Sequence, residues 1–197
     1  MQRLKNVELE LATGKVKELL DVVSQKLGMV PNMMRTMANA PAVLDGYLQL
    51  SGSLSHGQLS AKVREQIALA VAQSNGCNYC LAAHSAIGKM VGLTTDQIRD
   101  SRLGTAIDSK TESLIQFARK VVELRGRVSD DDLMQVRQAG FDDGAIAEVV
   151  ASVALDIFTN YFNLVAGTKI DFPEAAALKP TSAIQSATYT SNEMVQH

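Results

Sequence analysis

The stretch NGCNYCLAAHS, residues 75–85, contains the side chains whose types and spacing could do chemistry. Two residues separate Cys77 from Cys80, His84 follows four residues later, and the 197-residue chain has two cysteines in all. The nucleophilic form of cysteine is the thiolate, and a thiol with an ordinary pKa of ~8.5 is only a few per cent ionised at neutral pH. A nearby histidine can take up the thiol proton. The spacing therefore predicts thiol–disulfide redox chemistry.

A helix over residues 77–91 would place both cysteines and the histidine on one stripe, because an α-helix has roughly 3.6 residues per turn. Side chains three residues apart on a helix have Cβ atoms about 5–6 Å apart, against ~3.8 Å in a disulfide. We therefore expect the first turn to tighten when Cys77 and Cys80 form a disulfide. Such a bond should be easily reduced, which suits turnover rather than architecture.

Glu65 is the candidate partner for the histidine. The pair Asn75–Gly76 predicts a turn between two helices. Glu65 lies ten residues before this turn and His84 lies eight residues after it, so at ~1.5 Å per residue the two side chains are level within about one turn. We expect Glu65 to orient His84 and to complete a proton relay for Cys80. The rest of that helix face is apolar, with Ala68, Leu69 and Ala72.

Other uses of the cysteine pair are possible. A zinc ion could take Cys77, Cys80, His84 and Glu65 as four ligands, although consecutive ligands on one regular helix surround a tetrahedral ion poorly. Covalent haem attachment expects a histidine directly after the second cysteine, where this chain has Leu81. A thioredoxin-like fold would need a βαβ pattern, which the sequence lacks. A structural or metal-binding pair without enzymatic activity remains the alternative.

The elements that position these residues are predicted to be helical throughout. Apolar residues recur at helical spacing, and no segment shows the alternation of a strand. Helix starts are predicted at Ser60, Thr94, Ser109, Ser129 and Asp142, with capping boxes at Thr94 and Ser109. The last start opens the longest helix, which runs to about residue 166. The fold class is therefore all-α, with about eight helices.

Two segments suggest a repeat. GLTTDQI at 92–98 and GFDDGAI at 140–146 share a glycine, an apolar residue, a capping residue and an isoleucine at matching places. Each segment follows one helix and opens the next. Short junctions between helices resemble one another in any case, so a two-fold repeat of helical hairpins stays open.

Polar residues interrupt the longest predicted helix on one side. Asp156, Asn160 and Asn163 recur with helical spacing among apolar neighbours, and we expect this stripe to lie at a subunit interface. Together with the methionine-rich segment 29–37, it predicts a homo-oligomer. His56 and His197 fall in a predicted loop and in the tail, and no role is assigned to either.

Composition excludes several classes of function. The net charge is −2, apolar residues make up 46% of the chain, and tryptophan is absent, so no basic or stacking surface for nucleic acid is expected. No uninterrupted apolar run reaches the ~20 residues of a membrane span. The first fifteen residues lack the apolar core of a signal peptide. We expect a cytoplasmic protein with one domain over 1–175 and a flexible or partner-wrapping tail over 176–197.

The site residues resemble those of a known family. Glu65, eleven intervening residues, and then Cys77-x-x-Cys80-x-x-x-His84 are similar to the core motif of the AhpD-like alkylhydroperoxidases in the carboxymuconolactone decarboxylase family. NYFNLVAGTKIDFP, at 160–173, resembles the ending of a subgroup called uncharacterised peroxidase-related proteins. The likeness covers roughly residues 25–175.

The resemblance implies an all-α fold of repeated hairpins that assembles as trimers or hexamers. It implies a peroxidase without a bound cofactor, in which Cys80 reduces the peroxide, Cys77 resolves the product, and Glu65 and His84 relay protons. The implied reductant is a lipoylated or thioredoxin-like protein. Decarboxylation is not expected, because the lactone branch of the family generally lacks the cysteine pair.

The sequence departs from the best-studied branch of the family at one position. That branch has a second histidine just before the peroxidatic cysteine, where this chain has Tyr79. A tyrosine can donate a hydrogen bond, but a pKa near ~10 makes it a poor proton shuttle. We therefore expect Tyr79 to line the substrate pocket, with a weaker or redirected peroxidase activity.

Overall fold

The fold is that of a computed structural model, which describes residues 2–178. Regular structure in this part of the chain is entirely helical, which confirms the predicted all-α class. One short 3-10 helix, Leu9–Leu11, precedes nine α-helices, one more than the sequence pattern predicted. The helices are α1 (Gly14–Leu27), α2 (Asn32–Met37), α3 (Pro41–Leu54), α4 (Ala61–Ser74), α5 (Asn78–Met90), α6 (Thr95–Leu103), α7 (Ser109–Glu123), α8 (Asp130–Gln138) and α9 (Asp143–Ala166).

Side-chain caps define where most of these helices begin. One predicted start is wrong: Asp108, not Ser109, caps α7 by accepting a hydrogen bond from the amide of Thr111 at 2.7 Å. Glu112 does not complete a capping box there, because its carboxylate accepts from the amide of Ala106 instead. The other predicted caps are confirmed at Ser60, Thr94, Ser129 and Asp142.

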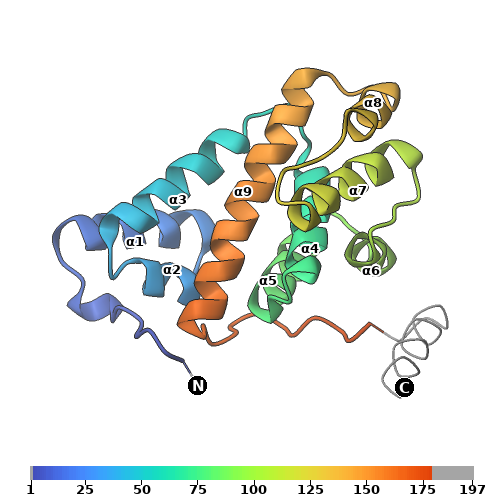
Figure 1. Ribbon diagram of the computed structural model, residues 1–197. Coiled ribbons are helices and arrows are strands. Elements are labelled where there is room, and N and C mark those ends of the chain that lie inside the picture. Colours follow the sequence, from blue (N-terminus) through green and yellow to red (C-terminus); the bar gives the residue numbers. More distant parts are fainter. Residues whose placement is uncertain (1, 179–197) are drawn as a thin grey trace, which may run out of the picture.

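Helices α4 and α9 form the centre of the described molecule. Helix α4 packs against α5, α6, α7 and α9, while α9 also contacts α3, α5 and α7. In Figure 1, α9 runs between α1–α3 on one side and α4–α8 on the other. Two apolar clusters result, one joining α1 through α6 and the other joining α4, α7, α8 and α9. The cysteine pair lies in the first cluster.

The two junctions that suggested a repeat have the same geometry. Gly92 and Gly140 both adopt left-handed backbone angles, with φ of 89° and 88°, which glycine reaches without steric cost. Two residues later, Thr94 and Asp142 cap the next helix. The same capped turn between two helices therefore occurs twice, and the repeat of whole hairpins stays a prediction.

Helix α9 is long and apolar enough, by length and composition, to cross a membrane. Packing accounts for part of this composition, since four other helices contact α9 and 44% of its most apolar window is buried. Its polar stripe also faces the interior of the described fold, as the site below shows.

Most of the predicted tail, 176–197, lies outside the described residues. Its described beginning is the last part of an extended segment that follows α9. Within this segment, the carbonyl of Ala176 accepts a hydrogen bond from the guanidinium of Arg102 on α6.

Candidate active site

The turn between α4 and α5 sets the position of the cysteine pair. Gly76 adopts a φ of 65°, and its amide donates to the carbonyl of Gln73 at 3.2 Å. The amide of Cys77 donates to the carbonyl of Ala72 at 3.0 Å. These two bonds form a Schellman motif, which ends α4 and satisfies its last carbonyls. The chain then leaves the turn at Cys77 in an extended conformation and starts α5.

Cys77 and Cys80 are joined by a disulfide, with their Cα atoms 5.3 Å apart. The expected tightening of the first helical turn is not what brings them together. Cys77 lies outside α5 as its N-cap, and its Sγ accepts a hydrogen bond from the amide of Cys80 at 3.3 Å. The extended cap residue turns the Cys77 side chain back toward Cys80. The pair is buried, with 1% and 2% of the two residues exposed.

Glu65 and His84 meet as predicted, across the α4–α5 hairpin. Glu65 Oε2 lies 2.8 Å from His84 Nδ1, and the two side chains are 16% and 21% exposed. Burial alone would lower the pKa of His84, but the charge and hydrogen bond of Glu65, together with the charge of Asp156, raise it to about 9. At neutral pH the imidazole is therefore protonated and paired with a carboxylate.

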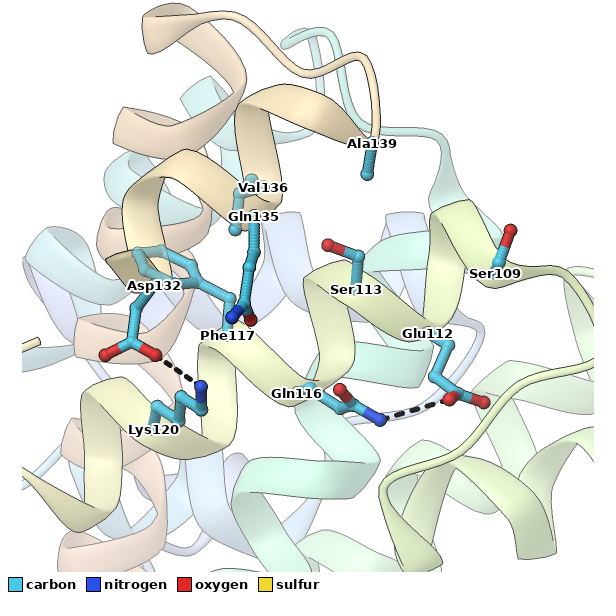
Figure 2. A pocket seen from close by; sticks show the side chains of 10 residues that line it. All are labelled: Ser109, Glu112, Ser113, Gln116, Phe117, Lys120, Asp132, Gln135, Val136 and Ala139. Atoms are coloured by element: carbon cyan, nitrogen blue, oxygen red, sulfur yellow. Dashed lines mark hydrogen bonds and ion pairs between the residues drawn. The ribbon is translucent and has the colours of Figure 1, made fainter. Parts of the chain in front are cut away.

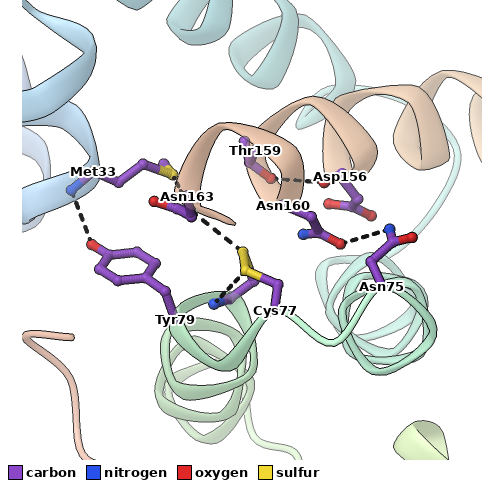
Figure 3. The surroundings of a disulfide bond; sticks show 9 residues. Met33, Asn75, Cys77, Tyr79, Asp156, Thr159, Asn160 and Asn163 are labelled. Carbon is purple, nitrogen blue, oxygen red and sulfur yellow. Dashed lines mark hydrogen bonds between the residues drawn. A yellow bond between two sulfur atoms is a disulfide. The ribbon is translucent and has the colours of Figure 1, made fainter. Parts of the chain in front are cut away.

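The polar stripe of α9 faces the chain's own interior, so its predicted place at a subunit interface is wrong. Asp156, Asn160 and Asn163 are all at least nine-tenths buried within the single chain. Figure 3 shows them pointing from α9 toward the α4–α5 turn. Asn160 accepts a hydrogen bond from the side chain of Asn75 at 2.9 Å, which ties α9 to this turn.

Asn163 contacts one of the two disulfide sulfurs. Its side-chain Nδ2 lies 3.4 Å from Cys80 Sγ and 3.2 Å from Met33 Sδ on α2 (Figure 3). Its carbonyl oxygen is buried and has no hydrogen-bond partner among the described residues.

Asp156 adds a second carboxyl group beside the Glu65–His84 pair. Burial raises the pKa of Asp156 to about 7, while the charge of His84 lowers it and that of Glu65 raises it. Tyr47 on α3 belongs to the same group of side chains. Burial and then the charges of Asp156 and Glu65 raise the pKa of Tyr47 to about 12, with an opposing hydrogen bond from Ser51. Four helices, α3, α4, α5 and α9, thus contribute titratable groups to this site.

Tyr79 packs in the core and connects three segments. Its hydroxyl oxygen accepts a hydrogen bond from the amide of Met33 at 3.2 Å, and its ring meets that of Phe172 edge-on at 5.9 Å. Burial raises the pKa of Tyr79 well above its usual range, as does the nearby Asp171, against the Met33 hydrogen bond. Its predicted place in a substrate pocket stays a prediction. His56 is exposed between α3 and α4, and His197 lies outside the described residues.

The described residues contain no preformed ligand cluster for the zinc ion of the alternative interpretation. Among residues 2–178, no group of three or more histidine, cysteine, aspartate and glutamate side chains is arranged to hold a metal ion. In this structure the two sulfurs bond to each other, and His84 and Glu65 pair with each other.

A separate polar hollow of about 230 Å³ lies between α7 and α8 (Figure 2). None of the predicted catalytic residues lines it. Its charged groups already have partners, since Lys120 pairs with Asp132, and Glu112 accepts hydrogen bonds from Gln116 and from the amide of Ala106. The hollow therefore offers no free charged group for chemistry.

Sequence reasoning recognised the polar stripe of α9 but not its role at the sulfur. The available signal was the seven-residue spacing of Asp156 and Asn163 on an otherwise apolar helix. That spacing shows that the two side chains share a face, but not which helix this face meets. Met33 carried no signal of its own, because methionine usually fills core space.

Comparison with known proteins agrees with the motif. Residues 41–124, which include all four predicted catalytic residues, match the carboxymuconolactone decarboxylase family. No curated protein shows significant similarity to the chain.

Solved structures show the same fold. The alkylhydroperoxidase AhpD core of an uncharacterized peroxidase-related protein from Ralstonia eutropha is 26% identical, with a TM-score of 0.78 over 86% of this chain and 92% of that one. An uncharacterized peroxidase-related protein from Silicibacter is 24% identical, with a TM-score of 0.72 over 86% and 94%. The debrominase Bmp8 is 17% identical, with a TM-score of 0.72 over 84% and 90%. The last two likenesses establish the fold alone. The family match over residues 41–124 and the shared fold confirm the predicted resemblance to the AhpD-like proteins of the carboxymuconolactone decarboxylase family.

Proposed function

We propose that this protein is a thiol-dependent peroxidase that reduces hydrogen peroxide or an alkyl hydroperoxide. The observation that supports it most is a redox-capable disulfide, Cys77–Cys80, beside a half-buried Glu65–His84 pair on the same helical hairpin. Nucleophile, base and orienting group are the parts that activate a thiol. No observation favours a purely structural role for the cysteines.

The first step joins sulfur to oxygen. The Cys80 thiolate attacks the terminal oxygen of the peroxide, the O–O bond breaks, and the sulfur becomes a sulfenic acid as the peroxide is reduced. The leaving alkoxide needs a proton. His84 is the candidate donor, because it lies one helical turn beyond Cys80 and is protonated at neutral pH. Its positive charge also favours the thiolate form of Cys80.

The second step closes the disulfide. The Cys77 thiol loses its proton and its sulfur attacks the sulfur of the Cys80 sulfenic acid; the displaced hydroxide takes up that proton and leaves as water. A dithiol reductant then exchanges with the disulfide and restores both thiols, itself becoming oxidised. The relay is reset when His84 takes the proton that the Cys80 thiol releases.

Two partners belong to this proposal. The reductant is a lipoylated or thioredoxin-like protein, and because the disulfide is buried, local opening must precede exchange.

The protein is a homo-oligomer, a trimer or a hexamer. An apolar groove of about 340 Å³ between α3 and α9 supports association, as do exposed side chains on the outer face of α9; these are Val150, Phe158, Tyr161, Leu164 and Val165. Light scattering that finds only a particle near 21.2 kDa would contradict it.

A coupled assay tests the activity. Peroxide consumption is measured with dithiothreitol, with a lipoylated protein and with thioredoxin as reductants, for the wild type and for Cys80→Ser. We expect consumption by the wild type with at least one reductant and none by the variant. A wild type whose thiols stay reduced in excess peroxide would refute the proposal.

A further inference from the structure

The side chain of Asn163 has an unusual set of contacts for a buried amide. Its nitrogen meets two sulfur atoms, Cys80 Sγ at 3.4 Å and Met33 Sδ at 3.2 Å. A disulfide sulfur and a thioether sulfur can only accept hydrogen bonds, so both N–H groups of the amide face sulfur. The carbonyl oxygen is then left over, and no described residue donates to it.

This arrangement is costly for a residue that only fills space. Sulfur is a weak acceptor, and a buried carbonyl without a partner costs about 1–3 kcal/mol. Asn160, one turn earlier on α9, also has an unpartnered buried atom, its Nδ2, but its oxygen accepts from Asn75 and it makes no hydrogen bond to sulfur among the described residues; the contact with Cys80 Sγ is what distinguishes Asn163. A buried polar atom without a partner, directly beside a reactive sulfur, indicates a group that acts during the reaction.

We propose that Asn163 is a catalytic residue of the Cys80 thiol. When Cys80 is reduced, the Asn163 N–H donates to its thiolate, which is a far stronger acceptor than a disulfide sulfur. The free carbonyl oxygen accepts the O–H of the incoming peroxide, whose terminal oxygen keeps this hydrogen as it is transferred to sulfur. One amide thereby holds both reacting atoms. Only the second part of this inference, the contact of the carbonyl oxygen with the peroxide, rests on the proposed peroxidase function.

Met33 and the start of α2 hold the amide in place. The amide of Met33 donates to the hydroxyl of Tyr79, and the neighbouring amide of Asn32 donates to the carboxylate of Asp171 at 2.6 Å. These bonds connect α2 to α5 and to the segment after α9. One N–H of Asn163 donates to Met33 Sδ, so the other N–H is left to donate to Cys80 Sγ.

The test of the first half needs no peroxide. In a Cys77→Ser background, where serine retains a helix cap, the rate of Cys80 alkylation by iodoacetamide is followed against pH. Asn163→Ala and Asn163→Leu should raise the midpoint by about one pH unit, through loss of a hydrogen bond to a charged group. The matched control Asn160→Ala, which removes an equally buried amide on the same helix, should leave it unchanged. Asn163→Leu should fold, because it also removes the unpaired carbonyl; an unchanged midpoint in either Asn163 variant would overturn the proposal.

The second half is tested by peroxide. At a pH where Cys80 is fully ionised in both proteins, Asn163→Leu should react with hydrogen peroxide roughly three- to tenfold more slowly, the worth of one ordinary hydrogen bond. An equal rate constant would overturn the role of the carbonyl. If the alkylation midpoint shifts but neither protein reacts with peroxide, the proposed function fails while the thiolate partner stands.

Discussion

His84 Nδ1 lies 2.8 Å from Glu65 Oε2. This contact joins α4 and α5, whose relative position is set by the tight turn between them. The two side chains are neither exposed nor fully buried, so solvent screens their attraction only in part. The imidazole therefore carries a stabilised positive charge one turn from Cys80.

Removal of the Glu65 charge should slow the reaction with peroxide. Glu65→Gln preserves the shape of the side chain but no longer stabilises the protonated His84. General acid–base groups typically contribute 10²–10⁴-fold, so turnover should fall by at least roughly a hundredfold. Glu112→Gln, at the hollow between α7 and α8, is the matched control and should retain full turnover. Full activity in Glu65→Gln would leave Glu65 outside the mechanism.

The titration of His84 should depend on its partner. Burial lowers the pKa of His84, and Glu65 is the main group that raises it, to about 9, so Glu65→Gln should bring this pKa down toward or below the ordinary value of about 6.5. Proton NMR of the imidazole in the disulfide form reports it directly. Because the folded pKa is raised, the contribution of the pair to stability is complete below about pH 6.5 and is lost as the pH rises through about 9. A wild-type pKa near 6.5 would contradict the charged relay.

Peroxide should mark Cys80 and not Cys77. In Cys77→Ser, a sulfenic acid on Cys80 has no resolving partner, so treatment with peroxide and dimedone should yield an adduct on Cys80 by mass spectrometry. In Cys80→Ser the remaining thiol, Cys77, lies farther from His84 than Cys80 does and should give none. Adducts in the reverse pattern would exchange the two roles.

The buried carboxyl of Asp156 should make stability fall with pH. An unfolded aspartate ionises near 3.8, whereas the folded group keeps its proton to about pH 7. Stability from this group is therefore complete below about pH 4 and is lost as the pH rises through about 7. Asp156→Asn should remove this fall and raise the free energy of unfolding at pH 8 by about one to a few kcal/mol. Urea unfolding at several pH values measures it, and a wild type with a flat profile would contradict it.

Alanine substitutions at Gly76 and at Gly52 should change the free energy of unfolding in opposite directions. Gly76 has a φ of 65°, and a Cβ atom at this position would meet no other atom within 4 Å, so space is not the obstacle. Gly76→Ala should therefore cost about 1–2 kcal/mol from backbone conformation alone. Gly52 lies inside α3 with equally open space, so Gly52→Ala should stabilise by about 0.5–1 kcal/mol. Urea unfolding of the two variants compares them, and equal shifts of the same sign would contradict this reasoning.

The hairpin could be predicted from the sequence because its determinants are local. The rise of a helix and the Asn75–Gly76 turn are enough to bring Glu65 level with His84. It was harder to predict that Cys77 caps α5 rather than lying in its first turn, because the two positions are adjacent in the sequence. The same kind of one-residue ambiguity separated Ser109 from Asp108 at the start of α7.

The role of the α9 stripe could not be predicted from local pattern. Helical spacing puts Asp156 and Asn163 on one face, but the partner of that face depends on how α9 packs against α4 and α5. A polar stripe on an apolar helix fits a subunit interface as well as a buried site. The packing of distant segments decides between them, and here it places Asn163 against Cys80.

The capping position of Cys77 also has a consequence for chemical damage. Groups held on one rigid frame react as though each were enormously concentrated, with effective molarities up to about 10⁵–10⁸ M for well-oriented pairs. The backbone holds the Cys77 and Cys80 Cα atoms 5.3 Å apart, so under the proposed peroxidase function the neighbouring thiol should react with a sulfenic acid on Cys80 before a dissolved oxidant does. The Schellman turn that ends α4 should then also limit irreversible conversion of Cys80 to sulfinic acid.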